Sequence, residues 1–268
     1  MNTAGLTAKI EEFMQRVVCQ NCRGKFDKQE IKDQPVKPYK LGQSIFTLHH
    51  QTDLTSEVGD RGGYVTDIVM MDDGRLVMCL PNQKRLLICN TDGSQVDSID
   101  VQGKPWCVTA VNNSTVAVTL WYSKCIEMYD INNKLKLKSI SVPGMWWKGS
   151  DITTINNKLV VGGDNRLLII DHQTGEVVQT IQTDCDPGRL HGSRDRIFYS
   201  DINYFNNKLY WYSYTDDTHH TLTLPSQPKG MTTLQDGSLY VCVLMDQYNM
   251  CHLMVNSISL LQQRDFKN

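Results

Sequence analysis

Cys19 and Cys22 form a CxxC pair near the start of this chain of 268 residues. Two thiolates at this spacing can bind one zinc ion, but a zinc site needs four ligands. No second CxxC pair and no pair of histidines at ligand spacing follows. We therefore interpret Cys19 and Cys22 as a chance pair or the remnant of a site, and we expect neither a metal ion nor another cofactor.

The histidines and carboxylates do not form a recognisable catalytic set. His191 could bind a metal ion only if ligands from elsewhere in the chain converged on it, and the positions that we take as equivalent offer none: Thr66, Val108, Ile152 and Met231. Asp67 and Asp151 are scattered candidates. The chain contains no Walker loop and no GxGxxG, HExxH or GxSxG motif. We expect a protein that is not an enzyme, and a metal-dependent hydrolase or lactonase is the least favoured alternative.

A third set of residues indicates binding rather than catalysis. Aromatic residues alternate with Lys and Arg in segments that we expect to be loops on one face of the fold. Exposed aromatic and Arg side chains form many of the hot spots of protein interfaces. We expect a protein partner on this face and a purely structural role for at least half of its aromatic and basic residues. The candidate binding residues are Trp106, Trp121, Tyr122, Lys124, Trp146, Trp147, Lys148, Arg189, Tyr204, Phe205 and Tyr248.

The charge of the chain makes RNA the second choice of partner. Lys and Arg number 27, Asp and Glu number 29, and the net charge is −2, so we expect no binding to DNA. Interleaved aromatic and basic side chains could stack on the bases and bind the phosphates of single-stranded RNA. Five carboxylates expected on the same face weaken its positive field and favour protein over RNA: Asp164, Asp184, Asp186, Asp201 and Asp246.

The composition also bears on where the protein works. Hydrophobic residues make up 40% of the chain and charged residues 21%, as in ordinary globular proteins. There is no apolar run of about 18 residues, and the N-terminus lacks the apolar stretch of a secretory signal. We therefore expect the nine cysteines to be reduced and the protein to be cytoplasmic, without membrane contact.

A repeat of about forty residues organises the chain. A second apolar strand precedes each of five short apolar strands, and turn pairs such as Asp73-Gly74 introduce it. The second strands start at Leu76, Val116, Leu159, Ile197 and Leu239. The five strands that follow them are spaced by 40, 41, 42 and 43 residues and start at Arg85, Cys125, Arg166, Lys208 and Cys251.

Each repeat is predicted to contain four strands, with an inner strand such as 65–69 first and an outer strand such as 96–101 or 177–181 last. One four-stranded sheet cannot bury both of its faces, whereas sheets stacked around an axis cover one another. We therefore expect an all-β β-propeller of four-stranded blades over residues 42–268. Five repeats are recognisable between about residues 64 and 263. The ring either has five blades or is a six-bladed ring lacking about one repeat, and segment 44–49 could add the strand that closes it.

The N-terminal residues are predicted to lie outside the propeller. Residues 1–23 place Leu6, Ile10, Phe13, Met14 and Val17 on one helical face. We expect a short amphipathic helix there, either the tail of a coiled coil through which chains oligomerise or a helix packed on the propeller. Residues 24–41 are charged and contain Pro35 and Pro38, which indicates a linker.

The repeats resemble those of the NHL family. Segment 164–175 has Asn, then a basic residue, alternating apolar residues and a polar turn ending in Gly, and segments 82–93 and 206–212 are similar. The span from about 42 to 263 resembles the C-terminal propeller of tripartite-motif proteins of the NHL type, particularly divergent invertebrate ones. The resemblance implies a recognition module that selects protein or RNA targets for a ubiquitin ligase. This chain has no RING domain and no B-box zinc ligands, so we expect no ligase chemistry of its own. The family ring usually has six blades.

Overall fold

The computed structural model describes residues 64–94, 96–146, 150–203, 205–233, 239–245 and 250–256. These residues form strands and turns, together with one short 3-10 helix at Pro81–Gln83. No helix in this part of the chain is long and apolar enough to cross a membrane. The helix expected within 1–23, the linker expected at 24–41, the strand expected at 44–49 and the Cys19–Cys22 pair lie outside the described residues.

The strands form five antiparallel sheets in which consecutive strands are neighbours. The first sheet consists of β1 (Ile68–Met70), β2 (Leu76–Leu80), β3 (Arg85–Cys89) and β4 (Asp97–Asp100). The second consists of β5 (Pro105–Ala110), β6 (Thr115–Leu120), β7 (Cys125–Asp130) and β8 (Leu135–Ser141). The third consists of β9 (Ile152–Ile155), β10 (Lys158–Gly163), β11 (Arg166–Ile170) and β12 (Val177–Gln182).

The two remaining sheets come from the C-terminal part of the described chain. The fourth sheet consists of β13 (Pro187–Ser193), β14 (Arg196–Asp201), β15 (Lys208–Ser213) and β16 (Thr218–Thr223). The fifth contains, within the described residues, β17 (Pro228–Thr233), β18 (Leu239–Met245) and β19 (Met250–Asn256). All five strands of the forty-residue repeat, and the five strands before them, are thus where the sequence predicts them.

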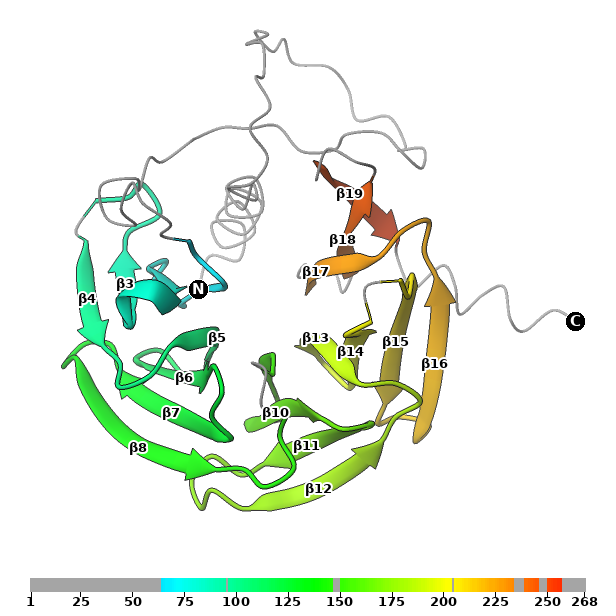
Figure 1. Ribbon diagram of the computed structural model, residues 1–268, viewed down its shortest axis with the longest axis horizontal. Helices are drawn as coiled ribbons and strands as arrows, with labels where there is room; N and C mark the ends of the chain where they lie inside the picture. The colour runs from blue at the N-terminus through cyan, green and yellow to red at the C-terminus, as the bar shows by residue number, and fades with distance from the viewer. Residues whose placement is uncertain are drawn as a thin grey trace, which may run out of the picture.

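The sheets stand around a common axis, as Figure 1 shows. The first strand of each sheet lies nearest this axis, and β4, β8, β12 and β16 lie at the periphery. The inner strands of successive sheets contact one another, from β1 and β5 to β13 and β17. This arrangement confirms the predicted β-propeller of four-stranded blades. The closing strand, and with it the choice between five and six blades, falls outside the described residues.

Apolar side chains on both faces of the middle strands explain why the sheets stack. Every residue of β6 is buried, and successive side chains of a strand point to opposite faces. Val116 and Val118 of β6 pack with the first sheet, whereas Ala117 between them packs with the third. The outer strands have water on one side, and Ile181 is the one buried residue of β12. The second sheet therefore gains its core by lying between the first and the third.

The fourth sheet lies close against the third at Gly192 of β13. The N–H of Gly192 donates a hydrogen bond of 2.9 Å to Oγ1 of Thr153 on β9. A Cβ atom at position 192 would lie 2.1 Å from the carbonyl oxygen of Thr154, well inside van der Waals contact. The two inner strands can therefore lie backbone against backbone only because residue 192 has no side chain.

Two classes of loop share one face of the ring: the loops between second and third strands, and the connectors between sheets. In four sheets a backbone N–H just after the outer strand donates to the carbonyl of the residue just before the third strand. The donor and acceptor residues, 2.7–2.9 Å apart, are Val101 and Lys84, Val142 and Lys124, Thr183 and Asn165, and Leu224 and Asn207. These bonds confirm that both classes lie together, as predicted, and we call this surface the loop face.

Candidate functional site

Four polar residues occupy the same place in four successive sheets, next to the axis. The strand pairing defines this equivalence. In each sheet, the third residue of the predicted second strand pairs with one residue of the inner strand, and these inner-strand residues occupy equivalent positions. The pairs are Met78 with Ile68, Val118 with Val108, Val161 with Ile152, and Tyr199 with Leu190. The residues just before these inner-strand partners are Asp67, Cys107, Asp151 and Arg189, and we call them the axial ring.

Hydrogen bonds to the axial ring join the first sheet to the second and the third sheet to the fourth. Oδ2 of Asp67 accepts a bond of 2.8 Å from the N–H of Val108 on the second sheet. Oδ2 of Asp151 accepts one of 2.8 Å from the N–H of Leu190 on the fourth sheet, and its Oδ1 accepts one of 2.8 Å from Ile152. Buried N–H groups need an acceptor, and these carboxylates are the acceptors for the N–H groups of Val108 and Leu190 on the neighbouring sheets.

The two carboxyl groups, the thiol and the guanidinium of the axial ring lie close together. The potential ligand atoms of Asp67, Cys107 and Asp151 are within 4.8 Å of one another. Nη1 of Arg189 lies 4.0 Å from Sγ of Cys107. Cys107 is 1% exposed and Asp151 is 8% exposed, whereas Asp67 and Arg189 are half-buried, so water screens the charges of the ring only in part. The guanidinium of Arg189 therefore compensates two carboxyl groups from other sheets.

Burial dominates the electrostatics of this ring. It raises the pKa of Asp67, and the nearby Asp151 carboxylate raises it further, while Arg189 acts in the opposite direction. Burial also raises the pKa of Asp151, again against Arg189. It raises the pKa of the Cys107 thiol well above its ordinary value, so Cys107 is a protonated thiol at neutral pH. With Cys107 protonated, the axial ring serves to connect the sheets through hydrogen bonds. Its carboxyl and thiol groups are also of the kind that bind divalent cations.

A comparison of the repeats in the wrong register hides this ring. The pairing makes His191 equivalent to Val69, Thr109, Thr153 and Thr232. The set taken as equivalent, Thr66, Val108, Ile152 and Met231, is therefore wrong. The pairing of Ile68 with Met78 and of Ile152 with Val161 is what aligns Asp67 with Asp151. His191 itself lies with Nε2 3.1 Å from Oγ1 of Thr233, and burial lowers its pKa to about 4, so it is neutral at pH 7.

On the loop face, the structure brings three of the predicted binding residues into one aromatic cluster. The ring centroids of Trp106 and Trp121 are 3.9 Å apart, and those of Trp121 and Tyr122 are 5.2 Å apart in an edge-to-face arrangement. Trp106 also packs against the core between the second and third sheets. Tyr122 is 63% exposed, and Lys124 is exposed two residues later. The cluster thus has a half-buried base, Trp106 and Trp121, and an exposed top, Tyr122.

The other predicted binding residues have different surroundings. Trp146, in the connector before β9, is half-buried, and its N–H donates to the carbonyl of Gly162 on β10. Phe205, in the loop before β15, is 97% exposed. Arg189 belongs to the axial ring. The remaining four lie outside the described residues: Trp147, Lys148, Tyr204 and Tyr248.

Comparison with known proteins defines the fold. No protein-family model and no curated protein sequence matches the chain. A streptogramin B lyase structure aligns with a TM-score of 0.57 and 17% identity over 74% of this chain and 67% of that one. Hydrazine synthase from Kuenenia stuttgartiensis gives 0.56 and 15% over 72% of this chain, which spans only 62% of that one. A chain of the mitotic checkpoint complex gives 0.57 and 12% over 75% of this chain and 64% of that one.

These matches correct two expectations. The prediction that the protein is not an enzyme is wrong in its basis, because propellers of this fold include a lyase and a hydrazine synthase, so an absence of familiar motifs does not exclude catalysis. The resemblance to NHL and tripartite-motif proteins finds support only at the level of the fold. What the comparisons show is that this chain is a β-propeller.

Proposed function

We propose that this protein is a recognition module that binds a protein partner through its loop face, with the cluster of Trp106, Trp121 and Tyr122 at the centre of the interface. The mitotic checkpoint complex, whose chain shares the fold, illustrates a propeller in a protein assembly. The proposal extends that use to this chain on the basis of its own residues.

The conformation of Tyr122 is the observation that carries the proposal. Its φ angle is +61°, a left-handed conformation that costs a residue with a side chain about 1 kcal/mol or more. The loop nevertheless holds Tyr122 there, 63% exposed and edge-on against Trp121. An exposed tyrosine that packs edge-on against a half-buried tryptophan is the type of aromatic anchor that interface hot spots use.

Replacement of Tyr122 tests the proposal. Proteins cross-linked to the wild-type chain in cells are compared, by quantitative mass spectrometry, with those cross-linked to Tyr122→Ala and Leu137→Ala. Leu137 is a matched control, 51% exposed but on the outer strand β8. We expect Tyr122→Ala to lose the dominant partner and Leu137→Ala to keep it, with equal melting temperatures. A partner that survives Tyr122→Ala and is lost with Leu137→Ala would refute the proposal.

A second candidate function is a metal-dependent reaction at the axial ring, favoured by the three potential ligand atoms within 4.8 Å of one another. Addition of Mn²⁺ or Zn²⁺ should then raise the melting temperature of the wild-type protein, since a ligand of the folded state stabilises it. Asp151→Asn should abolish that rise. The absence of any rise with the wild-type protein would remove this candidate.

A further inference from the structure

The loop face carries opposite charges on its two halves, although its backbone repeats. The residue just before the third strand is Lys84 in the first sheet and Lys124 in the second. The equivalent residue is Asn165 in the third sheet and Asn207 in the fourth, as the shared backbone hydrogen bonds show. Equivalent positions thus have a positive charge over two sheets and no charge over the next two.

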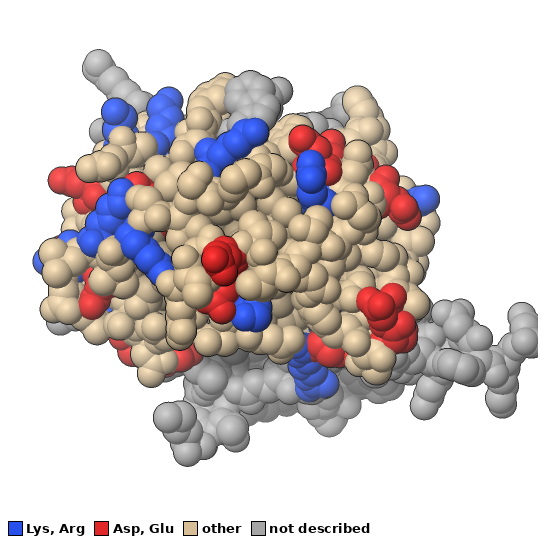
Figure 2. Space-filling model, turned by 90° about the horizontal axis from the view of Figure 1, so that it is seen from below, with Lys and Arg blue, Asp and Glu red and all other residues tan. Residues whose placement is uncertain are grey.

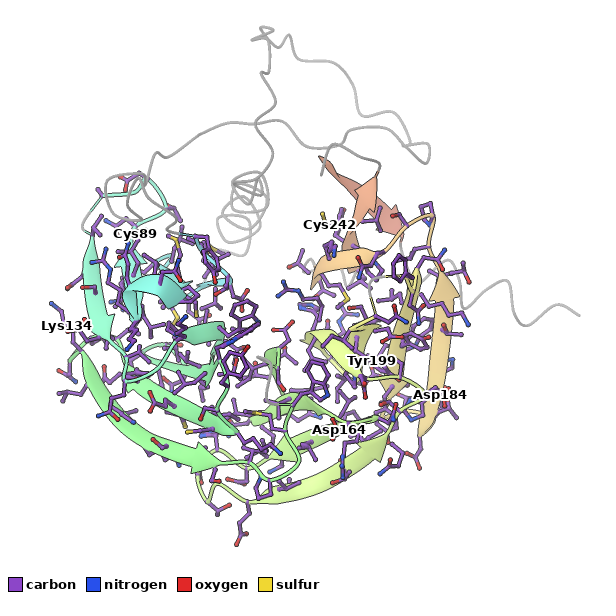
Figure 3. All side chains as sticks on the ribbon, in the orientation of Figure 1. Cys89, Lys134, Asp164, Asp184, Tyr199 and Cys242 are labelled. Atoms are coloured by element: carbon purple, nitrogen blue, oxygen red, sulfur yellow. The ribbon has the colours of Figure 1, made fainter. Side chains whose placement is uncertain are left out.

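One pair of equivalent connector residues has opposite charges. The carbonyl of Lys104, just before β5, accepts from the N–H of Trp121, which follows the second strand of the same sheet. The carbonyl of Asp186, just before β13, accepts from the equivalent Ile202. Asp164 and Asp184, both exposed, add to the acidic half, and Figure 3 shows them on the side of the third and fourth sheets.

The basic half surrounds the aromatic cluster. Lys104 is tied to the cluster through the bond from Trp121, and Lys124 follows Tyr122 in the same loop. Lys84 is tied to the connector that leads to Lys104, through the bond from Val101. All three lysines are exposed, and no carboxylate among the described residues forms an ion pair with them. They therefore add unpaired positive charge around an apolar anchor.

The rest of the visible surface does not repeat this pattern. Figure 2, which views the ring from the side of β8 and β12, shows basic and acidic side chains interspersed. Two lysines of the β7–β8 hairpin are engaged: Lys134 pairs with Asp97, and Nζ of Lys138 donates 2.9 Å to the carbonyl of Gln173. The basic half of the loop face therefore combines an exposed aromatic cluster and lysines without ion pairs in the described part of the chain, whereas the lysines Lys134 and Lys138 on the side of the ring have polar partners.

We propose that this basic half binds an acidic peptide segment that carries an aromatic or aliphatic side chain, with the carboxylates meeting Lys84, Lys104 and Lys124 and the apolar residue meeting Tyr122. The inference rests on the proposed function and names the chemistry of its partner. A short acidic segment fits a positive field limited to two sheets, whereas a longer polyanion such as RNA would cross onto Asp164 and Asp184 and be repelled.

Selection from a displayed library of random peptides on the whole chain tests this inference. We expect the selected peptides to be rich in Asp and Glu around one aromatic or aliphatic residue. Combined replacement K84Q, K104Q and K124Q should weaken them at least about tenfold, mainly through slower association at low salt. The control K134Q, K138Q and K158Q removes the same charge away from the loop face and should leave their affinity unchanged.

Three outcomes separate this inference from the proposed function. Peptides that depend on Tyr122 but not on the three lysines would overturn the acidic partner and leave the loop-face interface standing. Peptides that depend on neither would overturn both. Tighter binding of an oligouridylate probe than of any peptide, with the same dependence on the lysines, would replace the peptide by RNA and overturn the inference.

Discussion

Oδ2 of Asp67 accepts a hydrogen bond of 2.8 Å from the backbone N–H of Val108, a residue 41 positions further along the chain and on the next sheet. Asp151 repeats this relationship with Leu190, 39 positions away. We expect Asp151→Ala to destabilise the protein by roughly 1–3 kcal/mol, because the buried N–H of Leu190 loses its acceptor. Urea unfolding measures this difference. Asp184→Ala, on an exposed loop, should change the stability little, and equal effects of both substitutions would contradict the prediction.

Arg189 is expected to stabilise the axial ring by its charge. Arg189→Met leaves the buried carboxyl groups of Asp67 and Asp151 without a cation and should cost roughly 3 kcal/mol or more at neutral pH. Arg189→Lys should recover part of this loss. Because the pKa of both carboxyl groups is already raised by burial, the Met variant should regain stability as the pH falls and the carboxyl groups take up protons. A loss that stays constant with pH would show that packing, rather than charge, is what Arg189 provides.

His191 should make the protein less stable in acid. Its pKa is lowered to about 4 in the folded protein, against about 6.5 in an unfolded chain. Between these values the unfolded chain binds more protons than the folded one, so stability is kept above about pH 6.5 and is lost progressively down to about pH 4. His191→Gln should flatten this part of the curve of unfolding free energy against pH. An unchanged slope in the variant would assign the acid sensitivity to other groups.

Gly192 should tolerate no side chain. Gly192→Ala would place a Cβ atom 2.1 Å from the carbonyl oxygen of Thr154, so the third and fourth sheets must move apart. We expect a loss of roughly 3 kcal/mol or more, at the upper end of overpacking effects. Gly230→Ala is the matched control on β17, where the nearest atom to a new Cβ is 4.0 Å away on Cys242. Thermal unfolding measures the stability of both variants. Similar melting temperatures for Gly192→Ala and Gly230→Ala would contradict the prediction.

The sequence predicts the sheets well because their signals are local. Turns that contain a residue with left-handed backbone, such as Gly74 or Arg194, separate the first and second strands of a sheet. The apolar runs that flank these turns are long enough to be recognised as strands without knowledge of the strands with which they pair. The loop face follows from the repeat as well, because the phase of the strands decides at which end each loop lies. Trp106, Trp121 and Tyr122 could be assigned to it for this reason.

The axial ring could not be predicted in the same way. Asp67, Asp151 and Arg189 are separated by some forty residues or more, and no local pattern distinguishes them from turn residues. Their alignment requires the exact pairing of inner and second strands, and a shift of one residue replaces Asp151 by Ile152. The bulges that the register shows in β5 and β13 near these positions add a further residue that a sequence count does not reveal.

The backbone hydrogen bonds that tie each connector to a neighbouring loop involve no side chain of Lys84, Lys124, Asn165 or Asn207. The shape of this surface is thereby separated from its chemistry. Mutation can change a position such as Lys124 without disturbing the scaffold beneath, whereas Asn207 also donates 2.7 Å through Nδ2 to the carbonyl of Leu224. Related propellers could therefore acquire new partners at positions of the first kind while their architecture stays constant.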